Sequence, residues 1–383
     1  MEEENGVQEE RGAVRGGDGL YIHVPFCRSR CPYCHFYSTV DPAFIPQWVQ
    51  AVGKEADLYR RRFTHFDSLY LGGGTPSLLP EAILGEILET LNRVFSIDPC
   101  GEITLEANPG DLTPGKLKHW KAGGINRISL GVQSLNDREL EFLKRRHTVA
   151  EARKAIDRIR YAGFDNLNLD FIYGLPGQDA GTWRQTLEGI AALQPEHLSC
   201  YELTAEAGTP LDRDVRSGKI GLPGERERRA FFLQTSSFLE ARGYEHYEVS
   251  NFARGTAHYA RHNRKYWNRR RYLGLGPSAH SFDGVRRWWN GRSLKRYLEM
   301  LARGRRPAEG EETLSPEQRR LEALLLGFRT RSGVALADLS LNPERRKVLR
   351  ALESAGKIIQ TPERLIPTPK GFLVADRLPL LFC

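Results

Sequence analysis

The sequence of 383 residues lacks the features that would place it in a membrane or outside the cell. It has no run of about 18 apolar residues, the length that a membrane-spanning helix needs. Its first 18 residues are rich in Glu and contain no apolar segment of the kind found in a secretory signal. We therefore expect a cytoplasmic protein whose thiols stay reduced.

Cysteine is scarce, with six residues in the chain, and its distribution is uneven. Three of the six fall within one short segment, and the other three are scattered along the chain. A disulfide framework does not form readily in a reducing compartment, so a metal or catalytic cluster is the better interpretation of the short segment. The clustered residues are Cys27, Cys31 and Cys34; the scattered ones are Cys100, Cys200 and Cys383.

Length and charge indicate several domains and a basic body. A chain of this length usually forms two or three domains. The formal net charge is +8 although the N-terminal tail is acidic, so the remainder suits an anionic partner without requiring one. We expect a disordered acidic tail over 1–18, a barrel over 19–215, a C-terminal elaboration over 216–303, a linker over 304–313 and an end module over 314–383.

Strands and amphipathic helices alternate through the first half of the chain, which predicts parallel βαβ units. Six such strands form an α/β fold that is either an open doubly wound sheet or an incomplete barrel. The predicted strands are 20–24, 67–71, 102–107, 127–132, 166–172 and 197–203. The predicted helices between them are 43–63, 81–94, 114–122, 137–161 and 181–193.

Chemically distinctive residues cluster where these strands end. In parallel α/β folds, ligands bind at the carboxyl ends of the strands. One rim would therefore collect residues that core packing does not explain. Following the strands in order, these are the three cysteines, the run Gly72–Gly74 with Thr75, then Glu106, Gln133, Asp170 and Thr204.

The cysteine spacing, C-x-x-x-C-x-x-C, favours an iron–sulfur cluster. A [4Fe–4S] cluster usually takes four thiolates, so three leave one iron open to another ligand. Two alternatives are a zinc site completed by His35 or His23, and three thiols together by chance. The neighbouring glycines let a backbone approach a ligand closely, although an ordinary strand-to-helix turn is the alternative. No Gly-Lys-Ser/Thr follows them, so this is no phosphate loop.

This spacing, with Tyr33 before the third cysteine and GGGTP after the second strand, resembles the radical S-adenosylmethionine (SAM) superfamily. The resemblance implies an incomplete (β/α)6 barrel that holds a [4Fe–4S] cluster on Cys27, Cys31 and Cys34, with SAM at the open iron. Segments 21–27, 71–77, 131–137, 170–178 and 274–282 further resemble anaerobic coproporphyrinogen III oxidases and their haem chaperone relatives. By that resemblance, SAM would contact Tyr21, Tyr33, Gly73, Gly74, Thr75, Glu106, Gln133, Arg145 and Asp170, and more loosely Thr204 and His280.

Two positions distinguish the chaperone branch from the oxidases. The oxidases carry a further cysteine two positions after the third, where this chain has Phe36, as chaperones of the HemW type do. The chain also has the chaperone motif H-N-x-x-Y-W at 262–267. His262 is a candidate axial ligand of haem, beside aromatic rings and cations that suit a porphyrin and its propionates. The alternative is a buried, hydrogen-bonded structural histidine.

The last 70 residues predict two helices, 315–327 and 343–355, and two strands, 357–360 and 364–366, in the order of a winged-helix-like module. Basic and aromatic residues interleave over 261–272, which also fits nucleic acid. Without a recognition helix concentrated in Arg and Lys, we do not expect that partner.

The resemblance implies a haem chaperone that delivers haem to haem-requiring, respiratory proteins, with peripheral membrane contact as a further expectation. It leaves open whether SAM is consumed. The two alternatives are an anaerobic coproporphyrinogen III dehydrogenase and a radical SAM enzyme that acts on nucleic acid.

Overall fold

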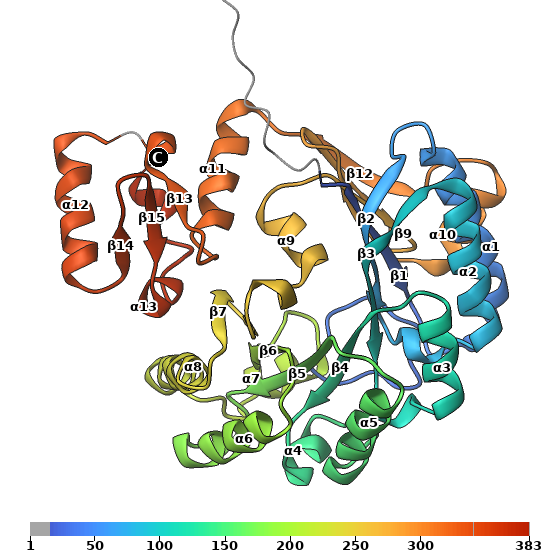
Figure 1. The fold of residues 1–383 in the computed structure, drawn as a ribbon, viewed down its shortest axis with the longest axis horizontal. Helices are drawn as coiled ribbons and strands as arrows, with labels where there is room; N and C mark the ends of the chain where they lie inside the picture. The colour runs from blue at the N-terminus through green and yellow to red at the C-terminus, as the bar shows by residue number, and fades with distance from the viewer. Residues whose placement is uncertain (1–15, 340, 383) are drawn as a thin grey trace, which may run out of the picture.

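The computed structural model describes residues 16–339 and 341–382, so most of the predicted acidic tail lies outside the described residues. Their main feature is a curved 12-stranded sheet with helices on its outer side (Figure 1). The strand order is β12-β11-β10-β9-β1-β2-β3-β4-β5-β6-β8-β7. Its first and last strands do not pair with each other, so the barrel is open, as the sequence predicts.

Six strands in chain order pair in parallel and form the centre of this sheet. They are β1 (Asp18–Val24), β2 (His65–Gly73), β3 (Ser96–Ala107), β4 (Arg127–Gln133), β5 (Leu167–Tyr173) and β6 (His197–Glu202). The helices between them cover the outer face: α1 (Ile45–Tyr59), α2 (Glu81–Val94), α3 (Pro114–Ala122), α4 (Asp137–Phe142), α5 (Val149–Tyr161) and α6 (Ala180–Ala192). All six predicted strands are present.

The predicted helix over 137–161 is two helices, α4 and α5. Lys144 adopts a positive φ of 50° between them, a conformation that a continuous helix does not contain. Thr148 then begins α5 with a capping box, in which its hydroxyl accepts from the Glu151 backbone and the Glu151 carboxylate accepts from the Thr148 backbone. The turn places Arg145 beside the strand ends.

Side chains alternate along the central strands, with apolar residues outward and polar residues inward. In β4, Ile128, Leu130 and Val132 are buried in the main core, which lies between the sheet and the helices. The intervening Arg127 and Ser129 line the interior of the barrel. The barrel therefore encloses a polar space, because period-2 alternation sends successive side chains to opposite faces.

The elaboration adds strands at both edges of the central sheet. β9 (Tyr272–Leu275) pairs in parallel with β1, and β8 (Asn251–Ala253) pairs antiparallel with β6. The remaining elements are α7 (Pro210–Arg216), α8 (Glu225–Glu240), β7 (Glu245–Glu248), α9 (Arg261–Trp267), β10 (His280–Phe282), β11 (Arg286–Asn290), α10 (Leu294–Ala302) and β12 (Ala308–Thr313).

The segment expected to be a linker, 304–313, contains β12 instead. This strand pairs antiparallel with β11 at the edge of the sheet. Its side chains are mostly exposed and three of them are glutamates, so its sequence has the polar character of a linker. Charged residues are tolerated on an edge strand because they discourage pairing with another chain.

Helix α9 closes the amino-terminal end of the barrel (Figure 1). The backbone N–H groups of Arg261 and His262 donate to the Glu102 carboxylate of β3 at 2.8 and 3.0 Å. Lys265 forms an ion pair with Asp67 of β2. The H-N-x-x-Y-W motif thus forms a plug held by two neighbouring strands.

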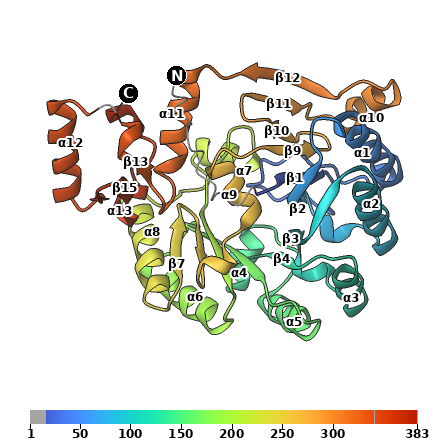
Figure 2. The ribbon, with the colours of Figure 1, turned by 45° about the horizontal axis from the view of Figure 1, so that its top comes forward.

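The end module has its own small core around Phe328 and Leu365. It contains α11 (Pro316–Gly327), β13 (Val334–Ala335), α12 (Pro343–Ser354), β14 (Ile358–Gln360), β15 (Arg364–Pro367) and α13 (Pro369–Phe372). Its three strands form a separate sheet, which lies beside the barrel (Figure 2). The sequence does not predict β13, because a strand of two residues is too short to show an alternation of apolar and polar side chains. None of the described helices could cross a membrane.

Glu55 of α1 ties the elaboration to the barrel. Its buried carboxylate accepts hydrogen bonds from the Gly276 backbone at 2.8 Å, the Asn290 amide at 2.6 Å and the Tyr297 hydroxyl at 2.6 Å. Burial raises the pKa of Glu55 from 4.5 to about 7, although these three donors favour the ionised form.

We predict that Glu55→Gln flattens the pH dependence of stability between about pH 5 and pH 7. Because the pKa of Glu55 is raised in the folded state, that state holds a proton that the unfolded state has released. The free energy of unfolding therefore falls as pH rises through this window, by about 1.4 kcal/mol per pH unit for one proton. The free energy of unfolding, measured with urea, should fall less steeply with pH in Glu55→Gln than in the parent. Glu89→Gln, at an exposed site on α2, should keep the parental dependence on pH. Equal slopes for Glu55→Gln and the parent would contradict the assignment.

Candidate functional site

A cavity of about 1150 Å³ opens where the central strands end. It is larger than the ~300–1,000 Å³ of most small-molecule pockets, so it has room for more than one ligand. It brings together most of the predicted site residues: Cys27, Cys31, Tyr33, Cys34, Gly73, Gly74, Thr75, Glu106, Gln133, Arg145, Asp170 and Thr204 all line it. Tyr21, His262 and His280 do not.

The cysteine loop is anchored at its base and along its length. The Cys27 backbone donates to the Thr39 carbonyl at 2.9 Å, which closes the loop at its base. The elaboration holds the far side, where Arg292 donates to the His35 carbonyl at 2.5 Å and the Leu294 backbone donates to the Tyr37 hydroxyl at 2.6 Å. The thiols are therefore presented to the cavity by a fixed segment.

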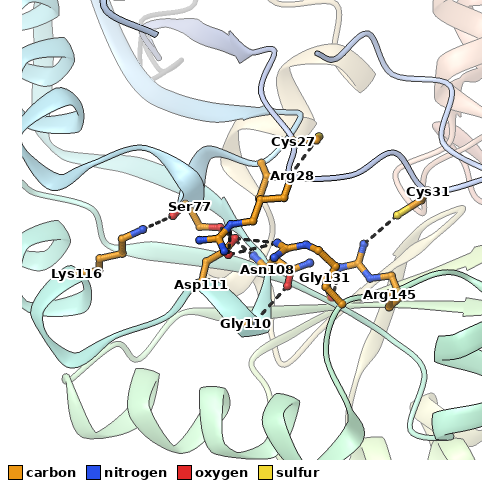
Figure 3. A network of polar contacts seen from close by, with 12 residues as sticks. Cys27, Arg28, Cys31, Ser77, Asn108, Gly110, Asp111, Lys116, Gly131 and Arg145 are labelled. Atoms are coloured by element: carbon orange, nitrogen blue, oxygen red, sulfur yellow. Dashed lines mark hydrogen bonds and ion pairs between the residues drawn. The ribbon is translucent and has the colours of Figure 1, made fainter. Parts of the chain in front are cut away.

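The three thiols are free. Two of them, Cys27 and Cys31, face polar partners (Figure 3). Thr75 Oγ1 lies 3.4 Å from Cys27 Sγ, and Arg145 Nη1 lies 3.7 Å from Cys31 Sγ. Burial raises the pKa of the Cys34 thiol, which metal binding would have to overcome.

Three free thiols on one loop that faces a shared cavity fit a cluster. Within residues 16–339 and 341–382, no three His, Cys, Asp or Glu side chains converge on one point as the ligands of a single ion would. An iron–sulfur cluster is wider than an ion, so its thiolates stand farther apart. The donors are three thiols from one loop, and cysteine thiolates are the ligands that hold iron–sulfur clusters.

The glycine run is required by close packing at the end of β2. A Cβ on Gly74 would lie 2.6 Å from the Val24 carbonyl oxygen, and one on Gly73 would lie 2.5 Å from the His23 ring. Gly73 also has a φ of 101°, which side chains rarely adopt. Packing against β1 thus explains these glycines, and the same packing exposes Gly73 and Gly74 to the cavity.

Two half-buried carboxylates face the cavity from β3 and β5, the strands on either side of β4. Glu106 accepts from the Tyr70 hydroxyl at 2.8 Å and from the Gly73 backbone at 3.0 Å. Asp170 accepts from the Asn168 amide at 2.8 Å. Burial raises the pKa of Glu106 to about 7 and also raises the pKa of Asp170. Such groups suit a ligand that brings positive charge or hydroxyl donors.

Gln133 and Arg145 complete the rim. Gln133 ends β4 with a φ of 70°, an uncommon backbone conformation for a residue with a Cβ. Arg145 Nη2 donates to the Gly131 carbonyl at 2.8 Å, which directs the guanidinium between β4 and Cys31 (Figure 3). The structure thus places a fixed cation beside the thiols.

Two of the expected SAM contacts, Tyr21 and His280, lie outside the cavity lining, and a third, Thr204, lies at its edge. Tyr21 donates toward His23 Nδ1 at 3.1 Å, outside the cavity lining. His280 begins the antiparallel strand β10 and stacks on Trp289 with ring centroids 6.0 Å apart, also outside the lining. Thr204 is exposed at the cavity mouth, with its hydroxyl directed to the Glu202 carbonyl at 3.3 Å.

His262 has the geometry of a structural residue and not that of the predicted axial ligand. It is buried, with Nδ1 3.0 Å from the Ser68 hydroxyl and Nε2 2.8 Å from the Tyr266 hydroxyl. Both ring nitrogens are therefore engaged, and burial lowers the pKa of the imidazole to about 3. The cavity is instead lined from this motif by Asn263.

Sequence reasoning missed the floor of the cavity. The floor residues are Tyr70, Arg127, Ser129, Asn168, Ser199 and Asn263, and the exposed Tyr201 also lines the cavity. A strand buried on both faces should read as continuously apolar, so the alternation in RISLGVQ (127–133) was the available signal of a polar interior. With these residues included, the lining carries eight Arg and Lys against four Asp and Glu, which suits an anionic ligand.

Comparison with known proteins identifies similar chains. The model of the radical SAM superfamily matches residues 21–190, and that of the HemN C-terminal domain matches 314–374. The chain is 35% identical to "Heme chaperone HemW" of Mycobacterium tuberculosis over 94% of its length and 93% of the relative. It is 36% identical to the Synechocystis protein of that name over 88% and 84% of the two chains.

Among solved structures, coproporphyrinogen III oxidase (HemN) from Escherichia coli superimposes with a TM-score of 0.82 over 96% of this chain and 90% of that one. The TM-score establishes a shared fold, and at 24% sequence identity the comparison concerns the fold alone. The open barrel and the additional end module are therefore an arrangement already known in a solved protein.

We predict that His262→Ala lowers the free energy of unfolding by about 2–4 kcal/mol, because it leaves the buried hydroxyls of Ser68 and Tyr266 without their partner. Chemical denaturation measures the change. His258→Ala, at a half-buried site outside the plug, should cost less than about 1 kcal/mol. Unaltered stability together with loss of haem binding in His262→Ala would instead restore the ligand assignment.

Proposed function

The chain belongs to the radical SAM superfamily and, within it, to the family of the HemW haem chaperones. From this membership we propose that it binds haem and delivers it to haem-requiring proteins of respiration. The observation that carries the proposal is the large cavity, where three free thiols and an excess of cations meet. Haem is a broad ligand with two anionic propionates, and guanidinium groups pair well with carboxylates.

We further propose that Cys27, Cys31 and Cys34 hold a [4Fe–4S] cluster with SAM beside it. When bound, this pair supplies reductive cleavage of SAM. The residues of the chain have separate tasks: Glu106 and Asp170 accept from the SAM ammonium and ribose hydroxyls, and Arg145 pairs with its carboxylate. Burial strengthens these contacts, because water does not compete for them.

The oxidase alternative is less well supported. Phe36 stands where the oxidases carry a cysteine, and its side chain is 71% exposed at the cavity. An exposed aromatic ring there offers a flat apolar contact in place of a fourth thiol. The sequence relatives described above carry the chaperone name.

The nucleic-acid alternative also loses its main support. Its basic and aromatic stretch, 261–272, includes helix α9, in which His262 and Lys265 are buried in the barrel. Tyr266 is held by His262. Side chains engaged in this way are not available to stack on bases.

We predict that Asp170→Asn weakens SAM binding by at least about tenfold, because it removes a buried charge that accepts from the ligand. Anaerobic reconstitution followed by calorimetric titration with SAM measures this affinity. The visible absorption of the cluster should persist in Asp170→Asn and disappear in Cys31→Ala, while Cys100→Ala, at an exposed thiol, should retain both cluster and SAM binding. Parental SAM affinity in Asp170→Asn would remove Asp170 from the site.

We predict that the reconstituted protein binds haem stoichiometrically and passes it to an apo-cytochrome without decarboxylating coproporphyrinogen III. Haem titration followed by the Soret band measures binding, and the appearance of the holo-cytochrome spectrum measures transfer. Product formation from coproporphyrinogen III, with a reductant and SAM supplied, would return the oxidase alternative. Failure to bind haem would reject the chaperone function.

A further inference from the structure

Arg127 places a guanidinium on the floor of the cavity. It is the first residue of β4, it is 1% exposed, and its side chain lines the cavity. Its Cα lies six residues before Gln133 at the rim, a distance of about 20 Å along an extended strand. Arg127 therefore belongs to a deeper level of the barrel than the cysteine loop.

This guanidinium has no partner of its own in the described part of the chain. Its side chain makes no hydrogen bond or ion pair there, and Nε is buried and unsatisfied. Three other cations of the cavity have partners within the chain. Arg28 and Arg146 share the buried Asp111 at 3.8 and 3.2 Å, and Arg145 donates to the Gly131 carbonyl.

Glu106 and Asp170, two carboxylates of the cavity, do not serve as contact partners of Arg127. Glu106 and Asp170 lie close enough for the charge of Arg127 to favour their ionised forms, but neither comes within ion-pair distance of it. Their oxygens accept from other donors, namely Tyr70 and Gly73 for Glu106, and Asn168 and Ser129 for Asp170. A buried charge without a contact partner is costly, so an anion from outside the chain would stabilise Arg127.

We propose that Arg127 forms a second anion subsite on the cavity floor, which takes one carboxylate of the bound tetrapyrrole, a propionate. The subsite rests on the haem-binding function proposed above and specifies how the ligand enters. SAM has its own cation at the rim, where Arg145 lies beside Cys31. A propionate that reaches Arg127 inserts one edge of the macrocycle into the barrel, while the opposite edge stays near the mouth and Phe36.

The test compares haem with haem dimethyl ester, in which both propionates are neutral. Affinity is measured by Soret titration of the reconstituted full-length protein, for the parent and for Arg127→Gln. We expect Arg127→Gln to bind haem at least tenfold more weakly, equivalent to about 1.4 kcal/mol, and to bind the ester as the parent does. Arg127→Lys, which keeps the charge, should recover part of the loss.

A matched control separates this subsite from the general charge of the cavity. Arg213 is an exposed cation at the mouth, so Arg213→Gln removes the same charge from a solvated position. We expect less than a threefold change, because water and salt screen that charge. Equal losses of haem affinity in both variants would overturn the subsite.

Three further outcomes of these titrations also test the subsite. A parent protein that binds haem and its dimethyl ester equally well overturns the subsite whatever the variants do, and this comparison does not depend on a variant that folds. Loss of SAM affinity in Arg127→Gln with unchanged haem affinity would make Arg127 a positioning residue for Glu106 and Asp170 and reject the anion subsite. A parent that binds neither haem nor ester rejects the chaperone function itself.

Discussion

The seating of α9 in the barrel is the interaction on which the rest of the site depends. A barrel with a polar interior must keep water out at one end, or its cavity becomes a channel. The Glu102 carboxylate closes that end by accepting both backbone N–H groups that begin α9. These are among the groups that a helix cannot satisfy internally, so one acidic side chain both caps the helix and fixes its position. The seat of α9 lies at the opposite end of the barrel from the strand ends that carry the thiols.

The elaboration supports the opposite end of the barrel. β9 extends the sheet beside β1, and the turn after it brings Gly276 so close to β1 that a Cβ would lie 2.5 Å from the His23 carbonyl oxygen. The same region reaches the cysteine loop through Arg292 and Leu294. Residues distant in sequence thus set the position of the thiols, and Glu55 holds this arrangement together from α1.

Local patterns predicted the central sheet and the rim, but not the contents of the barrel. The six strands are rich in β-branched and aromatic residues and are separated by helices, so their order follows from short segments. The role of His262 depends instead on Glu102 and Ser68, which lie 160 and 194 residues away in the chain. No local pattern distinguishes a histidine that will be buried by such contacts from one that will face a ligand. Strand β12 was predicted to be a linker for a related reason. Its side chains are mostly exposed, so its sequence shows no alternation of apolar and polar residues.

Charge compensation connects the cavity with its proposed ligands. Glu106 and Asp170 are acidic groups whose burial raises the pKa, and Arg127 is a cation without a contact partner, so the cavity is poised for ligand charges of both signs. A ligand cation beside Glu106 favours its ionised form, and by linkage binding releases a proton when the pH is near the raised pKa of about 7. A ligand anion at Arg127 acts in the opposite direction, since it offsets the positive field that helps to ionise both carboxylates. The two ligands therefore act in opposite directions on the protonation of Glu106 and Asp170, and these carboxylates link the rim electrostatically to the floor.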